Sequence, residues 1–571
     1  MVPVAARRGR LIVASGALFT LVGAAYSSAA LVALGGVVLS AVMTAYLAFF
    51  PTAVLLRRRK IELSWWIPPG EQPGGALTAD RPFQIHLALR NHSVRKLNVV
   101  GIRIFATRAL ELPEQLEAYV PPGQQVEVVG GARARSAGYQ VLHGAVATLA
   151  DPLGLFEVRA YFPNPIAIKV FPRRLVTRGG LALRPSGGTD HERVGLHRVK
   201  RRGLAGELRE IREHQHGDPF KFIAWKATAK RQRLMVRDLD TEIVVTYRIL
   251  LDISGSMRND LPGHNKLDYA IEVAAALAQS ALDGGDRVGL MTFDSRVYSE
   301  LRPGDGHQHY LKLVDRLLET HNVVDEDLTD LTNGELVSAV AGYLAHQEAI
   351  DVRLRRAPAL DDPAWERIQA GPGGELYDVA ALGRIVQTLL QSMNASTRQR
   401  SLAPAWWWSR VPIAPESDPA MARLRLFCRL RGLELPYRMI HPHGRRADGL
   451  LEASKRCAVG GRSDVVIVIS DLVGMIEKPA SASAAFARLR RTARKTAVIA
   501  PFGPAFLPAP ESDAGQKVAA ILERSEGEVY DEARTLLSGW GVPVLRAGPD
   551  DSPATLLARM GRRGRVARRV A

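Results

Sequence analysis

The chain has 571 residues, of which 47% are hydrophobic and 23% are charged. At about 100–200 residues per domain, this length predicts three or four domains and excludes a single small module. The ordinary composition excludes a disordered, collagen-like or disulfide-rich chain. A formal net charge of +18 favours an anionic neighbour such as phospholipid, nucleic acid or an acidic protein, without choosing among them. Cys428 and Cys457 are the only cysteines, which favours a reducing compartment.

An uncharged stretch dominates the first 60 residues. No Asp, Glu, Lys, Arg or His occurs between Leu11 and Leu56, whereas about 20 helical residues are enough to cross the hydrocarbon of a bilayer. We therefore predict a transmembrane helical hairpin over residues 1–60, with spans near 11–26 and 29–50. Basic residues flank both of its ends: Arg7, Arg8 and Arg10 precede it, and Arg57, Arg58, Arg59 and Lys60 follow it.

These basic flanks predict the orientation of the hairpin. Lys and Arg residues next to a span stay on the cytoplasmic side. Both ends of the hairpin, and the soluble body that follows, are therefore expected in the cytoplasm, at a bacterial inner membrane, with the lipid bilayer as a partner. A cleaved signal peptide is the alternative interpretation of the first apolar stretch. The second apolar run would then still anchor the chain, with the body on the same side.

The next two segments differ in composition. Residues 61–180 alternate apolar and polar side chains in short runs, such as Phe83–Leu89 and Val99–Phe105, and Pro and Gly clusters interrupt them. This pattern predicts a small all-β sandwich. Residues 181–242 are polar and basic with few apolar runs, which predicts a connector.

Apolar strands alternate with helical patterns from residue 243 onward. This alternation predicts an α/β domain with a parallel sheet covered on both faces, made of residues 243–342 and 461–571. Residues 343–460 fit the scheme poorly and are interpreted as an inserted helical subdomain. Its three consecutive tryptophans at 406–408 are expected to anchor a small core, with docking on a membrane or a partner as the alternative.

Oxygen-bearing side chains follow two of the predicted strands. Asp252, Ser254 and Ser256 come directly after the strand that ends at Leu251, and Asp471 ends the strand that begins at Val465. Open α/β sheets place their ligand sites at the carboxyl ends of parallel strands. A hard divalent cation such as Mg²⁺ takes about six oxygen ligands. The sequence therefore predicts a metal site with one or two carboxylates and neutral hydroxyls.

A threonine is expected to complete this site. Thr332 is the first choice, because Thr332-Asn-Gly-Glu335 has the form of a capping box, which exposes the hydroxyl at a helix start. Thr329 is a close second. The predicted ion is Mg²⁺, or another divalent cation such as Mn²⁺ or Ca²⁺.

The pattern Asp-x-Ser-x-Ser, with a later Thr and a strand-end Asp, resembles the metal-ion-dependent adhesion site of von Willebrand factor A domains. The stretch from Leu208 to Arg237, which includes Gly217-Asp218 and Trp225, resembles the signature of the domain of unknown function 58 family. This resemblance implies a multidomain chain with a transmembrane hairpin, a β-sandwich and an α/β Rossmann-like von Willebrand A domain with a helical insertion. The chain departs from the family in that insertion and in His214-Gln-His216.

The resemblance also implies a function. Family members are non-catalytic, metal-dependent binding proteins that often work beside a MoxR-type AAA ATPase in assembling or maturing other proteins. A metal held by few carboxylates keeps net positive charge, so an Asp or Glu of a protein partner can take its open coordination position. We therefore expect a binding module or assembly factor and not an enzyme.

Charged residues of the signature form a second candidate site. They are either a plain solvated face or a patch that pairs with a partner's charges: Arg209, Arg212, Asp218, Lys226, Arg231 and Arg237. Trp225 is expected to pack in a core. His214 and His216 lack further nearby ligands and are expected to be structural.

Two other functional classes are less favoured. The sequence has no Gly-x-x-x-x-Gly-Lys-Ser/Thr motif, and the two serines of the metal site are not in a Gly-x-Ser-x-Gly motif. A metal-dependent hydrolase is therefore the weaker alternative. A basic nucleic-acid-binding membrane protein is the other, but the hairpin flanks account for part of the charge and no RNA-binding motif is evident. No nucleic-acid partner is expected.

Overall fold

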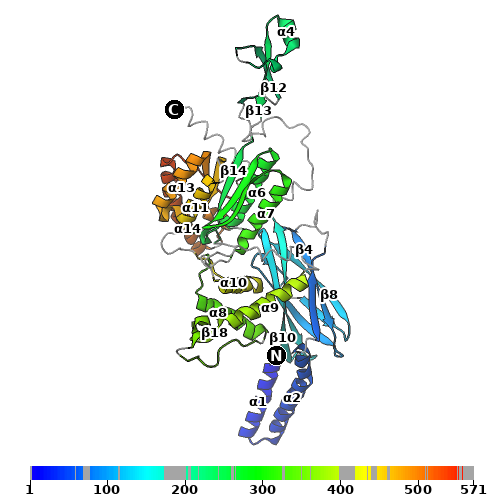
Figure 1. Cartoon of the computed structure of the whole chain (residues 1–571). Helices are drawn as coiled ribbons and strands as arrows, with labels where there is room; N and C mark the ends of the chain where they lie inside the picture. The colour runs from blue at the N-terminus through cyan, green and yellow to red at the C-terminus, as the bar shows by residue number, and fades with distance from the viewer. Residues whose placement is uncertain are drawn as a thin grey trace. The chain divides into compact units, whose positions relative to one another are not determined.

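The computed structural model shows a multidomain chain with a pair of N-terminal helices and several sheets (Figure 1). It divides into two compact units, one of residues 1–181, 260–264 and 317–440, the other of residues 182–259, 265–316 and 441–571. The structure describes residues 3–556 apart from 58–59, 69–76, 114–115, 173–200, 204–206, 217, 242–243, 259–262, 264, 324–327, 349, 360–361, 398–417, 434, 439–445, 460–462, 508, 511, 550 and 552–555.

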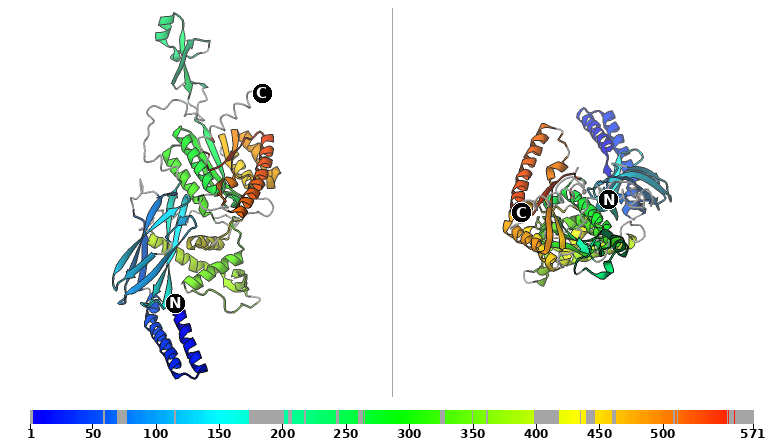
Figure 2. Two further views of the ribbon diagram at one scale, coloured as in Figure 1. Left: turned by 180° about the vertical axis from the view of Figure 1, so that it is seen from behind. Right: turned by 90° about the horizontal axis from the view of Figure 1, so that it is seen from above.

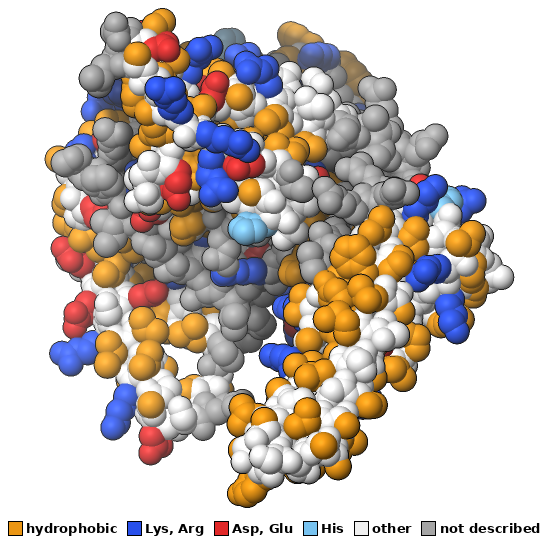
Figure 3. All heavy atoms as spheres, turned by 90° about the horizontal axis from the view of Figure 1, so that it is seen from below, with side chains coloured by type: hydrophobic (Ala, Val, Ile, Leu, Met, Phe, Trp, Pro, Cys, Tyr) orange, Lys and Arg blue, Asp and Glu red, His pale blue; other side chains and the backbone are white. Residues whose placement is uncertain are grey.

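The predicted helical pair is present as α1 (Arg7–Ala25) and α2 (Ala29–Arg57). Both helices are long and apolar enough to cross a membrane, over 7–25 and 29–55. Glycines let them approach closely: a Cβ at Gly35 would lie 2.7 Å from the Gly16 carbonyl oxygen, and one at Gly23 would lie 2.7 Å from the Val32 nitrogen. Hydrophobic side chains cover their outer surface (Figure 3).

Two β-sheets follow and share one hydrophobic core. We call these two sheets together the sandwich. Their strand orders are β1-β10-β9-β5-β7, with β3 beside β10, and β2-β4-β8-β6. Helix α2 adds Val42, Phe49 and Ala53 to this core. The strands are β1 (Val4–Ala5), β2 (Ile61–Trp66), β3 (Leu77–Thr78), β4 (Pro82–Asn91), β5 (Leu97–Ala106), β6 (Leu110–Glu111), β7 (Leu116–Val120), β8 (Gln125–Ala134), β9 (Gly138–Ala150) and β10 (Phe156–Phe171).

A helical segment of residues 317–440 belongs to the same unit as the sandwich. Its core joins Leu336 and Val340 of one helix to Leu424 and Phe427 of another, and Tyr161 of the sandwich packs against this core. The helical segment of residues 317–440 therefore lies nearer the N-terminus than the predicted range of 343–460. The elements are α8 (Asn333–Tyr343), η4 (Leu344–Glu348), η5 (Pro363–Arg367), β17 (Ile368–Ala370), β18 (Leu376–Asp378), α9 (Val379–Thr397) and α10 (Pro419–Arg431). The tryptophans at 406–408 lie outside the described residues.

His143 links β9 of the sandwich to α10. Its Nδ1–H donates to the Leu430 carbonyl oxygen at 2.8 Å. Burial, together with the charges of Arg429 and Arg431, lowers the pKa of His143 to about 4, and the hydrogen bond to Leu430 opposes this shift only partly. The imidazole therefore stays neutral where α10 docks.

This shift predicts a pH-dependent docking of α10. At pH values between the pKa of His143 in the opened state, about 6.5, and its lower pKa in the folded state, the imidazole is protonated only in the opened state. The docking of α10 is therefore destabilised as the pH falls through this range. A shift of this size corresponds to roughly 3 kcal/mol at most. We expect amide exchange over residues 419–431, corrected for intrinsic rates, to accelerate from pH 6.5 to pH 4 in the wild type and much less in His143→Gln. An equal acceleration in both proteins would contradict the prediction.

Residues 201–241 form a small antiparallel sheet with a short helix, where the sequence predicts a connector. Its strand order is β11-β13-β12. The elements are β11 (Arg201–Gly203), β12 (Glu207–Glu213), η2 (Phe220–Phe222), α4 (Trp225–Arg231) and β13 (Met235–Thr241).

A six-stranded sheet of order β16-β15-β14-β19-β20-β21 organises the other unit. All neighbouring strands are parallel except β16, which is antiparallel to β15. Helices α6 and α7 cover one face, and α11 and α13 cover the other (Figures 1 and 2). The strands are β14 (Thr246–Asp252), β15 (Arg287–Phe293), β16 (Val297–Gly304), β19 (Ser463–Ile469), β20 (Ala493–Pro501) and β21 (Val544–Ala547).

Helix α11 (Arg446–Val459) belongs to this sheet and not to the helical segment. Its Leu450, Ala453 and Cys457 pack in one core with Leu250 of β14 and Phe486 of α13. The other helices of this unit are α5 (Gly255–Arg258), α6 (Lys266–Asp283), α7 (Gly306–Glu319), α12 (Val473–Glu477), α13 (Pro479–Thr492) and α14 (Asp513–Gly539).

Candidate metal centre

Three adjacent parallel strands each lead into an aspartate at their carboxyl ends. Strand β14 ends at Asp252, β15 is followed by Asp294, and β19 is followed by Ser470 and Asp471. The order β15-β14-β19 brings the three ends side by side. All three carboxylates are buried. Asp294 is absent from the sequence-based site, although its position directly after a predicted strand, like that of Asp471, is a signal that could have identified it.

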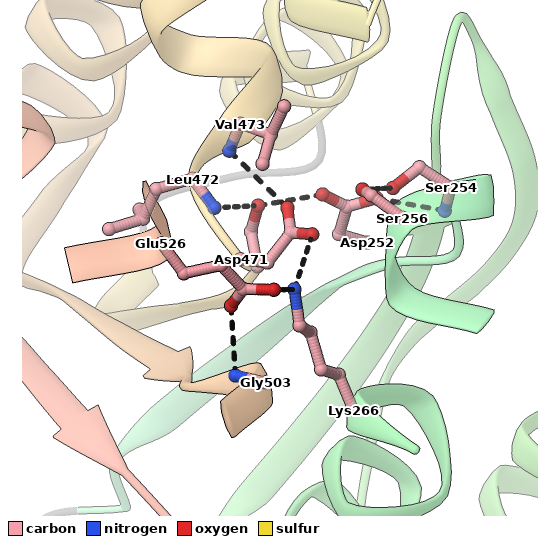
Figure 4. Close-up of polar contacts among 10 residues, drawn as sticks. Asp252, Ser254, Ser256, Lys266, Asp471, Leu472, Val473, Gly503 and Glu526 are labelled. Atoms are coloured by element: carbon pink, nitrogen blue, oxygen red, sulfur yellow. Dashed lines mark hydrogen bonds and ion pairs between the residues drawn. The ribbon is translucent and has the colours of Figure 1, made fainter. Parts of the chain in front are cut away.

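Hydrogen bonds fix the Asp252 carboxylate. Its Oδ1 accepts the backbone N–H of Ser254 at 2.9 Å, and its Oδ2 accepts the hydroxyl of Ser470 at 2.6 Å (Figure 4). The Ser254 and Ser256 hydroxyl oxygens lie 3.1 Å apart. The structure therefore brings four of the five predicted metal ligands, Asp252, Ser254, Ser256 and Asp471, to one edge of the sheet.

The site is short of positive charge. Burial, and after it the nearby charges of Asp471 and Asp294, raise the pKa of Asp252 to about 7, against the opposing hydrogen bonds from Ser470 and Ser254. A carboxylate buried beside two others favours a cation that compensates all three.

Lys266, at the start of α6, supplies part of this compensation. Its Nζ lies 3.4 Å from Oδ2 of Asp471 and 3.0 Å from Oε1 of Glu526 (Figure 4). Burial by itself lowers the pKa of Lys266, but the two carboxylates outweigh it and the net shift is upward. The Gly503 backbone N–H donates to Glu526 Oε2 at 3.0 Å. No sequence motif marks Lys266 or Glu526, and both are absent from the predicted site.

The two candidate threonines lie in the other compact unit. Thr332 is the N-cap of α8, and the predicted capping box is confirmed. Its hydroxyl donates to Oε2 of Glu335 at 2.7 Å, and the bonds from Thr332 lower the pKa of Glu335. Thr329 is buried, and its hydroxyl accepts a hydrogen bond from Arg425 Nε at 3.3 Å.

The donor set at the sheet edge fits a hard divalent cation. Carboxylate and hydroxyl oxygens are ligands that Mg²⁺ and Ca²⁺ accept. Asp252, Asp294 and Ser470 line one small pocket with Phe293 and Met475. In the described part of the chain, no three His, Cys, Asp or Glu residues group closely enough to hold a metal by themselves. The serine hydroxyls would therefore be essential ligands.

Two residues of the second candidate site, on residues 201–241, form an ion pair within the small sheet. Arg212 and Asp218 face each other through two hydrogen bonds, Nη1 to Oδ2 at 2.7 Å and Nη2 to Oδ1 at 2.6 Å. Lys226, Arg231 and Arg237 are exposed. Arg209 lies on β12, but its side chain is outside the described set.

Trp225 contradicts the expectation that it packs in a core, because 67% of it is exposed. The small sheet of residues 201–241 buries Met235 and Val236, but Trp225 begins α4 on its outside. Of the two histidines, His214 has its ring centroid 6.1 Å from that of Phe220.

The Arg212–Asp218 pair predicts a local effect on stability. The Arg212 guanidinium, and after it the Gln215 backbone N–H, hold the pKa of Asp218 far below its usual range. Asp218→Asn removes the charge that both donors bind, which weakens both hydrogen bonds. We expect roughly tenfold faster exchange of the Gln215 amide, measured by NMR.

Glu213→Gln is the matched control for this variant. Glu213 also pairs with an arginine of the same small sheet, Arg233, at 3.0 Å, but both side chains are largely exposed. Exposed pairs contribute little. Similar exchange rates in the two variants would contradict a structural role for Asp218.

The comparisons with known proteins match only part of the chain. Residues 210–340 match a family described as "Protein of unknown function DUF58". No curated protein matches the chain. This family match covers the end of the small sheet and the Asp252 turn, but it stops before Asp471.

Solved structures give only a weak likeness. A FixG-related protein from Vibrio parahaemolyticus is 12% identical, with 18% of this chain and 95% of that chain covered and a TM-score of 0.13. Alpha-2-macroglobulin from Escherichia coli, from domain MG7 to the C-terminus, is 11% identical, with 88% of this chain and 62% of that chain covered and a TM-score of 0.15. Salmonella alpha-2-macroglobulin reacted with methylamine is 13% identical, with 88% of this chain and 26% of that chain covered and a TM-score of 0.15. Likenesses this low support no conclusion about function.

Proposed function

We propose that this chain is a membrane-anchored, non-catalytic protein-binding module, and that its α/β domain is of the von Willebrand factor A type with a metal-ion-dependent adhesion site. One observation carries the proposal: Asp252, Ser254 and Ser256 lie beside Asp471 at the ends of neighbouring parallel strands. The match of residues 210–340 to the DUF58 family supports it.

The proposed ion is Mg²⁺, with Mn²⁺ or Ca²⁺ as alternatives. Asp252, Ser254, Ser256 and Asp471 would hold it. A bound cation would supply an open coordination position for an Asp or Glu of another protein. Ser470 orients Asp252 through the 2.6 Å hydrogen bond, and Lys266 orients Asp471 through their ion pair.

The proposed partner is a MoxR-type AAA ATPase, and the chain would act as an adaptor or assembly factor beside it. Any chemical step would then belong to the partner. The two apolar helices support a bacterial inner-membrane location, and their basic flanks support a cytoplasmic body.

Affinity capture tests this proposal. The full chain, solubilised in detergent from its native membrane, is used as bait with either Mg²⁺ or a chelator, and retained proteins are identified by mass spectrometry. We expect an AAA ATPase to be retained with Mg²⁺ and lost with the chelator. Identical retained proteins under both conditions would overturn the metal-dependent part of the proposal.

A further inference from the structure

A groove of about 940 Å³ lies where α2 meets the sandwich. One face of α2 lines it, because Ala45, Ala48, Phe49 and Thr52 follow the i, i+3, i+4, i+7 spacing. The opposite wall comes from the chain around Leu97 of β5 and from other loops of the sandwich. The volume is in the range of sites that bind a small molecule.

The groove is apolar along its length and exposed at its rim. Among the lining residues, Val94 is 94% exposed, Leu153 66% and Tyr119 56%. Contiguous exposed apolar side chains mark a surface that contacts another apolar body. Tyr is also enriched where a membrane meets water.

Positive charge lies at the same rim. Arg95 and Lys96 line the groove and are exposed. Nη1 of Arg95 donates to the Ala48 carbonyl oxygen at 3.1 Å, which holds the guanidinium against α2. Asp151 is the one acidic side chain of the lining, and it is buried. Its carboxylate accepts the backbone N–H groups of residues 153, 155 and 156, and Arg95 and Lys96 together outweigh its single negative charge.

The length of α2 places this groove at the surface of a bilayer. The helix has 29 residues, or about 43 Å at 1.5 Å per residue, whereas the hydrocarbon is about 30 Å thick. If the bilayer begins at Ala29, its hydrocarbon ends after about 20 residues, within the stretch 45–52 that lines the groove. The cations at the rim would then lie at the depth of phospholipid head groups.

We propose that the groove binds one anionic phospholipid of the surrounding bilayer. An acyl chain lies along the Ala45, Ala48 and Phe49 face of α2, and Arg95 and Lys96 bind the phosphate. Arginine and lysine both bind phosphate, arginine with two parallel hydrogen bonds. This inference rests on the proposed membrane anchoring of α1 and α2.

The test uses the full chain in nanodiscs of phosphatidylcholine with one-fifth phosphatidylglycerol. After gentle detergent extraction, native mass spectrometry counts the phosphatidylglycerol retained per protein. We expect about one in the wild type, and several-fold less in Arg95→Glu/Lys96→Glu and in Ala48→Trp, which fills the groove without changing the charge. Full retention in both variants would overturn the proposal.

Arg103→Glu/Arg159→Glu is the matched control, because these arginines are exposed on strands of the sandwich and do not line the groove. We expect this control to retain lipid like the wild type. An equal loss of lipid in the control would show that only the overall charge matters, and would overturn the proposal that the groove binds the lipid. Vesicle flotation separates the two proposals. A wild-type chain that fails to float overturns the anchoring, whereas floating variants that keep their lipid overturn only the groove.

Discussion

Replacing Asp252 by alanine is expected to abolish the Mg²⁺-dependent capture of the partner. Asp252 brings negative charge to the centre of the site, and it is held by Ser470 and by the Ser254 backbone. Loss of a side chain that only orients a metal ligand already costs about 10–100-fold in affinity. We therefore expect Asp252→Ala to lower the affinity for the cation by roughly 100-fold or more, measured by isothermal titration with Mn²⁺ or Mg²⁺.

The fold is expected to survive this substitution. The raised pKa of Asp252 reports the cost of its burial and, after that, repulsion from Asp471 and Asp294, and the variant relieves both. Asp252→Asn is the closer variant, because its amide oxygen can still accept the Ser470 hydroxyl. Asp305→Asn, on an exposed ion pair with Arg287, is the control and should bind metal normally. Normal capture by a folded Asp252→Ala protein would rule out a metal-dependent site at this edge of the sheet.

Replacing Lys266 by methionine is expected to destabilise the α/β domain strongly. The ammonium group lies between the Asp471 and Glu526 carboxylates and is buried. Removing one partner of a buried ion pair leaves an uncompensated charge and costs about 3–5 kcal/mol. We expect the midpoint of thermal unfolding to fall by several degrees in metal-free buffer.

Added Mg²⁺ should stabilise Lys266→Met more than the wild type. Without the ammonium group, a divalent cation at the sheet edge would compensate Asp252 and Asp471 alone, so its binding would contribute more to stability. The measurement compares the Mg²⁺-induced shift in the unfolding midpoint of both proteins. Lys312→Met, an exposed lysine of α7, is the control. A smaller Mg²⁺ shift in Lys266→Met than in Lys312→Met would mean that Lys266 has another role.

Features with a local physical cause could be predicted from the sequence. The uncharged stretch from Leu11 to Leu56 predicts α1 and α2, because a long apolar run can satisfy its backbone in lipid only as helix. The Thr332 capping box is equally local, since it joins residues three apart. The neighbourhood of Asp252 and Asp471 was predictable because parallel strands end on the same edge of a sheet.

Features that depend on which surfaces meet were not predictable in the same way. The spacing of apolar residues in α8 and α11 shows that each helix has an apolar face, but it does not show which part of the protein packs on that face. Helix α8 packs with α10, next to Tyr161 of the sandwich, and α11 packs on β15 and β16. Trp225 is apolar, and 67% of it is nevertheless exposed.

Composition and spacing in the chain thus specify the two apolar N-terminal helices, the strand ends and the carboxylate and hydroxyl side chains that follow these strands, since each depends on neighbours a few residues away. Three-dimensional packing alone brings Lys266 and Glu526 to Asp471, because 205 and 55 residues of chain separate them from it and no periodic pattern spans such distances. The same packing closes α2 against the sandwich loops and so creates the groove. Contacts between distant segments depend on how whole surfaces fit together, which no local stretch of sequence encodes.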